Sequence, residues 1–155
     1  MAGSAHFPIV RQTMSQKDWG VVWSGNDLPL SEGRVDNWDP QEIAVIQNHL
    51  GERDLLNDYT QCRFIMSLKF QELLSTCVPD LVQFLPLRLQ LVDGSLEWRG
   101  FAIAHFLSWI PLHVAEANAR TFDIFRTPDY ASNFRVTPAL KQEIRKAKLK
   151  GIEFT

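Results

Sequence analysis

The 155-residue chain contains only two cysteines, Cys62 and Cys77, and both lie in apolar surroundings. We interpret them as buried free thiols rather than as a disulfide or as metal ligands. The chain has no apolar run near the roughly 18 residues that a membrane-spanning helix needs. Its N-terminal residues lack the basic segment and long apolar stretch of a secretion signal. These absences predict a cytoplasmic protein that does not associate with membranes.

The residue patterns of common active sites are absent as well. The eight glycines are scattered, so the sequence has no phosphate-cradling loop, no dinucleotide fingerprint and no GxSxG motif. The four histidines form neither HxxxH nor HExxH, and none pairs with cysteine at ligand spacing. We therefore predict that the protein is not an enzyme and that it needs neither a metal nor another cofactor.

One group of residues keeps an enzymatic alternative open. Asp80 and Glu97, the latter two residues before Arg99, are similar to the carboxylate pair of metal-dependent nucleases. Arg99 stands where such a site needs lysine, and a guanidinium cannot be deprotonated. The alternative is a small enzyme of unknown type with Asp80, Glu97 and His105 on one sheet face.

The charges are unevenly distributed along the chain, although the net charge is only -2. Residues 1–60 contain nine acidic and four basic residues, whereas the remainder contains twelve basic and nine acidic residues. Much of the basic excess lies near the C-terminus, in Lys141, Arg145, Lys146, Lys148 and Lys150. We interpret this run as favourable charge at a helix end and a solvated face, and we favour this reading over binding to nucleic acid.

Helix signals occur at three places in the sequence. Asp39 precedes Pro40 and can cap a helix that runs to Leu50. Ser67 can cap a second helix that ends at Cys77, and Thr137 can cap a third that begins at Pro138. In the third helix one face is apolar, with Leu140, Ile144 and Ala147. The basic last turn of this helix is followed by Gly151, a residue free to adopt a positive φ.

Short β-rich segments fill much of the rest of the chain. The strands are predicted around residues 19–23, 64–66, 124–125, 134–136 and 152–154, and as a hairpin that joins residues 82–91 to 96–107. Pro86 has no N–H to donate, so it should lie at a sheet edge or a bulge. Residues 109–118 are ambiguous, residues 1–17 are interpreted as a loose arm, and residues 25–39 as a surface loop.

Together these elements predict one α+β domain over residues 1–155, with a mainly antiparallel sheet and three helices packed on it. A chain of this length can bury about 70% of the surface that its unfolded form exposes, which is enough for a core without disulfides. No repeat, low-complexity segment or linker divides the chain.

Two blocks of the sequence resemble a bacterial polymorphic-toxin immunity family, the eleventh of the numbered immunity families and formerly a domain of unknown function. The resemblance covers roughly residues 55–155. The later block matches the family pattern IFR followed by V(T/S)xxLKxxIxxAxLxGIEF, and its matching residues are Ile124-Phe125-Arg126, Val136-Thr137, Leu140-Lys141, Ala147, Leu149 and Gly151-Ile152-Glu153-Phe154. The earlier block comprises Asp58-Tyr59, Ile65 to Ser67, Phe70 to Leu74 and Phe84-Leu85-Pro86-Leu87.

This resemblance implies an immunity protein whose partner is a cognate toxin, the C-terminal toxin domain of a secreted effector. Such a protein binds the toxin made by the same cell and blocks its active site or its access to substrate. Binding of this kind depends on shape, a few aromatic anchors and complementary charge, and it leaves no catalytic motif in the sequence.

The acidic N-terminal part suggests where a toxin with a basic cleft could bind. An inhibitor of such a cleft does well with carboxylates around an aromatic anchor, because the charges speed association and the anchor slows dissociation. Trp38 is expected to be the exposed anchor, and a solvated acidic face is the alternative interpretation. The predicted toxin-binding residues are Asp36, Trp38, Asp39, Glu52, Asp54 and Asp58.

Overall fold

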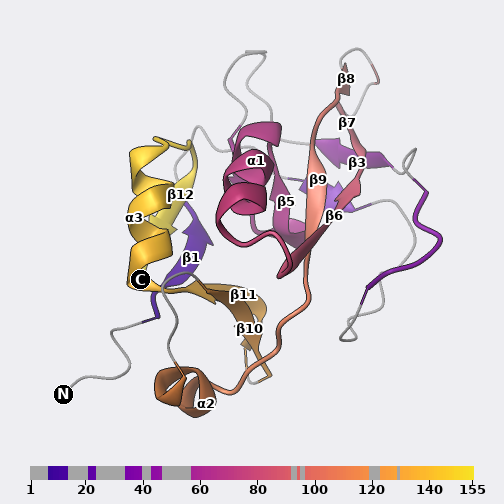
Figure 1. The fold of residues 1–155 in the computed structure, drawn as a ribbon. Helices are drawn as coiled ribbons and strands as arrows, with labels where there is room; N and C mark the ends of the chain where they lie inside the picture. Colours follow the sequence, from indigo (N-terminus) through magenta and orange to yellow (C-terminus); the bar gives the residue numbers. More distant parts are fainter. Residues whose placement is uncertain are drawn as a thin grey trace.

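A computed structural model describes residues 7–13, 21–23, 34–39, 43–46, 57–91, 94, 97–118, 123–128 and 130–155. These residues form three α-helices and three four-stranded, mainly antiparallel sheets (Figure 1). This arrangement confirms the predicted α+β fold class. No helix in the described part of the chain is both long and apolar enough to cross a membrane.

The first sheet joins the two ends of the sequence. Across the sheet its strands are β10 (Ile124–Thr127), β11 (Tyr130–Val136), β1 (Ile9–Gln12) and β12 (Ile152–Phe154). β1 is an inner strand that pairs antiparallel with both β11 and β12. The interpretation of residues 1–17 as a loose arm is therefore wrong for residues 9–12. A side chain of β1, Val10, is fully buried in the main core, which holds the strand in place.

The second sheet contains most of the predicted central hairpin. Its strands are, in order, β4 (Tyr59–Thr60), β5 (Ile65–Met66), β9 (Ala102–Phe106) and β6 (Val82–Pro86), with a short 3-10 helix over Cys62–Phe64. β6 is an outermost strand, which confirms the expectation that Pro86 lies at an edge. At the two ends of the β6–β9 ladder, the Leu87 N–H donates to the Phe101 carbonyl and the Leu107 N–H donates to the Leu81 carbonyl. Because bonded residues alternate along the ladder, Pro86 faces outward and its missing N–H costs no ladder bond.

The third sheet contains the largest error of the sequence analysis. Its strands are β2 (Val21–Trp23), β3 (Ile43–Ile46), β7 (Arg88–Leu91) and β8 (Glu97–Trp98). The predicted helix over residues 40–50 is wrong for residues 43–46, because β3 pairs antiparallel with β2 and parallel with β7. The other residues of this predicted helix lie outside the described part of the chain. Three of the four residues of β3 are β-branched and favour a pleated strand, and the long-range pairing overrides the local capping signal of Asp39.

Two of the three helices match the prediction and the third lies elsewhere. α1 (Leu68–Cys77) begins after Ser67, whose Oγ accepts from the Phe70 N–H at 3.3 Å. α3 (Pro138–Lys146) begins after Thr137, whose Oγ1 accepts from the Leu140 N–H at 3.4 Å. The remaining helix, α2 (Leu112–Ala117), falls in the segment that the sequence left ambiguous.

The main core lies beneath α1 and α3 and joins the first two sheets. Phe106 and Phe134 stack with ring centroids 4.6 Å apart, and Phe64 meets both rings edge-on. Tyr59 adds edge contacts with Phe134 at 5.7 Å and with Phe70 at 6.1 Å. Aromatic pairs of this kind contribute about 0.5–1.5 kcal/mol each beyond their burial, so the cluster links the two sheets strongly.

Candidate functional site

The described residues place the predicted acidic surface in two separate parts of the molecule. Asp36, Trp38 and Asp39 lie in the segment 34–39, where both carboxylates are exposed. Asp58 lies just before β4. Glu52 and Asp54 are outside the described residues. Residues 43–46 of the helix that Asp39 was expected to cap form β3, and residues 40–42 are outside the described residues.

Trp38 is half-buried rather than a fully exposed anchor. Its indole Nε1 donates to the Pro86 carbonyl at 2.6 Å, and its ring packs against the apolar cluster around Leu87 and Leu89. The neighbouring Val35 is held by both ends of the Gln83 amide, since Oε1 accepts from the Val35 N–H at 2.7 Å and Nε2 donates to the Val35 carbonyl at 2.9 Å. The segment is therefore fastened to the outer side of β6.

Asp58 uses both carboxylate oxygens inside the protein. Its Oδ1 accepts from Ser67 Oγ at 2.6 Å, and its Oδ2 accepts from the Lys150 N–H at 2.6 Å. Its backbone also bonds to these two residues, at 2.8 and 2.9 Å. Hydrogen bonds to a carboxylate are among the stronger ones in proteins. Asp58 thus joins the start of α1 to the segment that leads into β12.

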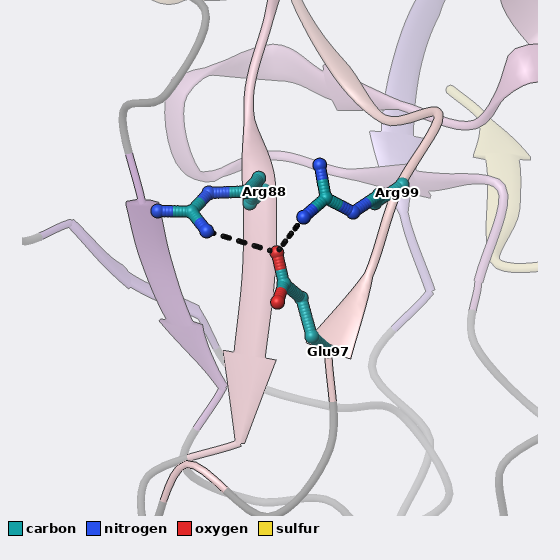
Figure 2. Close-up of polar contacts among 3 residues, drawn as sticks. All are labelled: Arg88, Glu97 and Arg99. Atoms are coloured by element: carbon teal, nitrogen blue, oxygen red, sulfur yellow. Dashed lines mark hydrogen bonds and ion pairs between the residues drawn. The ribbon is translucent and has the colours of Figure 1, made fainter.

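The residues of the enzymatic alternative do not gather at one site. Glu97 lies on β8 in the third sheet, where its Oε1 is 3.3 Å from Arg88 Nη1 and 3.4 Å from Arg99 Nη2 (Figure 2). His105 lies on β9 opposite Gln83, and Asp80 is exposed in the turn before β6. The β6–β9 ladder separates the turn with Asp80 from β8, because these lie beyond its opposite ends. Among the residues that the structure describes, no three metal-ligating side chains form a group.

A buried cation, Arg126 on β10, is a feature that the sequence analysis did not identify. Only 5% of it is exposed, and its guanidinium carbon lies 4.1 Å from the Trp109 ring centroid and 4.8 Å from that of Phe64. Its backbone bonds to Ser108 and Ile110 at 2.9 Å and so bridges the first sheet to the chain that leaves β9. The signal was present in the sequence as an arginine within an apolar strand.

The surroundings of Arg126 explain its electrostatics. Burial lowers the pKa of Arg126 to about 10, and the nearby Tyr59 opposes this shift. Burial raises the pKa of the Tyr59 hydroxyl, which therefore stays neutral. Arg126 lines neither the pocket beside α2 nor the pocket beside α3. Its contacts join the first sheet to the chain that follows β9. Cation–π attraction offsets part of the free-energy cost of removing the guanidinium from water.

Cys77 is a free thiol at the end of α1, half-buried where the sequence predicted a buried one. Burial raises its pKa, and the negative charge of Glu143 adds to the effect. A raised pKa leaves less of the nucleophilic thiolate at neutral pH. The side chain of Cys62 lies outside the described part of the chain.

The pocket beside α3 is a groove between the end of that helix and β12, with a volume of about 410 Å³. Ile144, Arg145, Lys148 and Leu149 line one side, and the three residues of β12 line the other. This volume is within the range of small-molecule and peptide side-chain pockets. The basic run that the sequence analysis interpreted as a solvated helix end therefore contributes two exposed cations to a groove.

Comparison with known proteins adds no relative, since neither a protein-family model nor a curated protein sequence matches this chain.

Proposed function

We propose that this protein is an immunity protein, which binds a cognate toxin and blocks the toxin's active site or its access to substrate. The proposal starts from the resemblance of residues 55–155 to the toxin-immunity family. It is supported by the way in which the two resembling blocks fit together in the fold.

The two blocks, which are far apart in the sequence, lie against each other in the fold, and each of three contacts between them includes one residue that matches the family pattern. Asp58 of the first block bonds to Lys150, next to the final Gly-Ile-Glu-Phe of the second, and Tyr59 packs edge-on against Phe134 between the second block's two parts. At Gly151 the φ is +80°, and a Cβ there would overlap the side chain of Asn57. Asp58, Tyr59 and Gly151 match the family pattern and lie where the two blocks meet, and this observation supports the proposal.

The geometry favours binding over the enzymatic alternative. A catalytic site needs its acid, base or metal ligands within reach of one reacting group. Asp80, Glu97 and His105 lie in a turn and on two different sheets, and Glu97 contacts two arginines. Inhibition by binding needs no such cluster.

Co-expression with the toxin domain encoded beside this protein's gene tests the proposal. We expect the toxin domain alone to stop growth, and we expect this protein to restore growth and to form a stoichiometric complex with the domain. Failure to restore growth by abundant, folded protein would contradict the proposal.

A matched variant separates binding from catalysis. Asp80→Asn combined with Glu97→Gln should leave protection intact, because neither carboxylate is needed to occupy a toxin surface. Loss of protection by a variant that still folds and still binds the toxin would instead favour the enzyme.

A further inference from the structure

β12 is an edge strand of the first sheet, and no residue that the structure describes bonds to its outward backbone groups. In its antiparallel ladder with β1, Ile9 and Thr155 exchange two hydrogen bonds of 3.0 Å, and the Thr13 N–H donates to the Gly151 carbonyl at 3.1 Å. Bonded pairs alternate along such a ladder, so Glu153 is the next residue that bonds to β1. The N–H and C=O groups of Ile152 and Phe154 therefore point away from β1, toward the outer side of the sheet.

The side chains of these two residues point toward α3. The Phe154 ring centroid lies 5.4 Å from Lys141 Nζ and 5.6 Å from the Arg145 guanidinium carbon. Both Ile152 and Phe154 pack against the main core, whereas Glu153 projects from the opposite face and is exposed. Figure 1 shows α3 beside β12. The groove is lined by the end of α3, by Lys148 and Leu149 after it, and by β12.

The chemistry of the groove combines an apolar floor with a basic rim. Ile144, Leu149, Ile152 and Phe154 supply apolar surface, and Arg145 and Lys148 supply two exposed positive charges. The acidic Glu153 contributes to the lining, but its side chain belongs to the other face of the strand. A segment bound in the groove can therefore form backbone hydrogen bonds, bury one or two apolar side chains and pair a carboxylate with a positive charge.

We propose that this groove binds an extended acidic segment of a partner protein, which adds to the first sheet as a new strand antiparallel to β12. Strand addition at a sheet edge is a general mode of peptide recognition, in which backbone hydrogen bonds give affinity and alternate side chains give specificity. All strand pairs of the first sheet are antiparallel, which favours the same direction for the added strand. The inference depends only on the groove, and it holds whether or not the partner is a toxin.

The register of the added strand follows from the geometry. Residues directly opposite Ile152 and Phe154 would bond to their outward backbone groups and would place their side chains on the same face, toward α3. Apolar side chains at these positions meet Leu149 and Ile144, and carboxylates reach Arg145 and Lys148. The intervening residues of the segment project toward the other face and need only be compatible with a strand.

A short capped peptide provides the probe. In this peptide threonine occupies every second position, and valine or glutamate occupies the positions between. All apolar and acidic side chains therefore lie on one face of the extended peptide. Its control carries lysine in place of glutamate. We expect the acidic peptide to bind at least tenfold more tightly than the lysine peptide at low salt, and we expect the difference to shrink as salt is added. Equal binding, or no binding of the acidic peptide, would overturn the proposal.

N-methylation of the same peptide tests strand pairing directly. Methyl groups on the valine and glutamate nitrogens should abolish binding, because these N–H groups face β12. Methyl groups on the threonine nitrogens should have little effect, because those N–H groups face solvent. Equal sensitivity of both sets would overturn strand addition, and the reverse pattern would overturn the antiparallel direction.

Protein variants locate the binding surface. Arg145→Glu combined with Lys148→Glu should weaken binding of the acidic peptide by at least tenfold. Lys146→Glu is the matched control, because Lys146 is exposed, lies 3.2 Å from Glu143 and does not line the groove. A similar loss in both variants would show that only the general charge of the helix matters, and would overturn the site.

Amide hydrogen exchange gives a readout that charge reversal alone cannot produce. The amides of Ile152 and Phe154 should exchange slowly only when the acidic peptide is bound, whereas the amide of Glu153, which faces β1, should be protected in both states. Binding that leaves the exchange of Ile152 and Phe154 unchanged would overturn the proposal.

Discussion

The edge strands β6 and β12 belong to two different sheets, and they differ in what contacts their outward backbone groups. On β6 the outward Pro86 has no N–H, and its carbonyl is bonded by the indole of Trp38. Next to it the Gln83 side chain holds both backbone groups of Val35 against the strand. On β12 the outward groups of Ile152 and Phe154 face a groove. One edge is closed by a proline and a segment of the chain, and the other has outward backbone groups to which no described residue bonds.

The comparison shows that charge and aromatic residues alone do not mark a binding surface. The acidic segment around Trp38 has both, yet its aromatic ring and backbone are already used to close β6. The basic end of α3 resembled an ordinary helix terminus, yet it borders backbone groups that no described strand pairs. Unpaired edges invite association with another chain, and proteins usually cover or shorten them. An open edge with a shaped, charged groove is therefore the more informative feature.

The largest effect should follow from removing the core that both edges share. Phe134 is fully buried and stacks on Phe106, in a cluster that includes Val82 of β6 and contacts Phe154 of β12. Truncating a buried phenylalanine costs about 3–5 kcal/mol. We expect Phe134→Ala to lower the free energy of unfolding by this amount in denaturant titrations and to loosen both edges in hydrogen exchange. Faster hydrogen exchange at only one of the two edges would show that β6 and β12 pack on separate cores.

A smaller effect should be selective for β12. Asp58→Ala removes the acceptor of the Lys150 N–H and of Ser67 Oγ, and hydrogen bonds to charged groups contribute about 1.5–3 kcal/mol. We expect a loss of stability in that range, together with faster exchange of the amides of β12 but not those of β6. Asp36→Ala is the control, because Asp36 is exposed and should change stability by less than about 0.5 kcal/mol. Indistinguishable variants would show that Asp58 does not hold β12.

Removing the side chains that cover the outer edge of β6 should lower stability by less than the changes above. It should also leave the outward backbone groups of β6 without a described partner, as they are on β12. Gln83→Ala removes two hydrogen bonds to Val35, each of which contributes about 0.5–1.5 kcal/mol. We expect a modest fall in the melting temperature and faster exchange of the Phe84 amide, which faces the same side as Pro86. Combining Gln83→Ala with Trp38→Ala should increase self-association in sedimentation experiments. A variant that remains as monomeric as the parent would show that Pro86 alone protects this edge.

The smallest effect should come from a charge that belongs to neither edge. Lys146 forms an exposed ion pair with Glu143 three residues earlier, and such pairs contribute about 0.2–0.5 kcal/mol. Lys146→Ala should therefore change the melting temperature very little and should leave hydrogen exchange at β6 and β12 unchanged. A clear change in the hydrogen exchange of β12 would show that Lys146 also belongs to the basic rim of the groove, beside Arg145 and Lys148.

The parts of the fold that were predicted correctly depend on local signals. Ser67 and Thr137 mark the starts of α1 and α3 because their hydroxyl groups cap N–H groups only three residues away. The proline of β6 was placed at an edge because its missing donor is a property of the residue itself. Gly151 has the expected positive φ of 80°, although α3 ends at Lys146 and Lys148, with a φ of 53°, is an earlier residue with a positive φ.

The parts that were missed depend on partners far away in the sequence. β3 follows a good helix-capping signal at Asp39, and only its pairing with β2 and β7 makes it a strand. β1 is four residues long and has one fully buried side chain, so its pattern is too short to interpret alone. The groove was missed for the same reason, since the outward groups of β12 are defined only by its register with β1.

The pairing of β1 with β12 also has a consequence for synthesis on the ribosome. β1 ends at Gln12 and β12 begins at Ile152, so one neighbour of the inner strand is absent until nearly all of this sequence has been translated. At about 5–20 residues per second, that wait is roughly 7–28 s. For most of that time β11, the other neighbour of β1, has not been translated either, so the nascent β1 has neither of its described partners. We expect this sheet to be completed only after translation of Phe154, and the nascent protein to depend on chaperones until then.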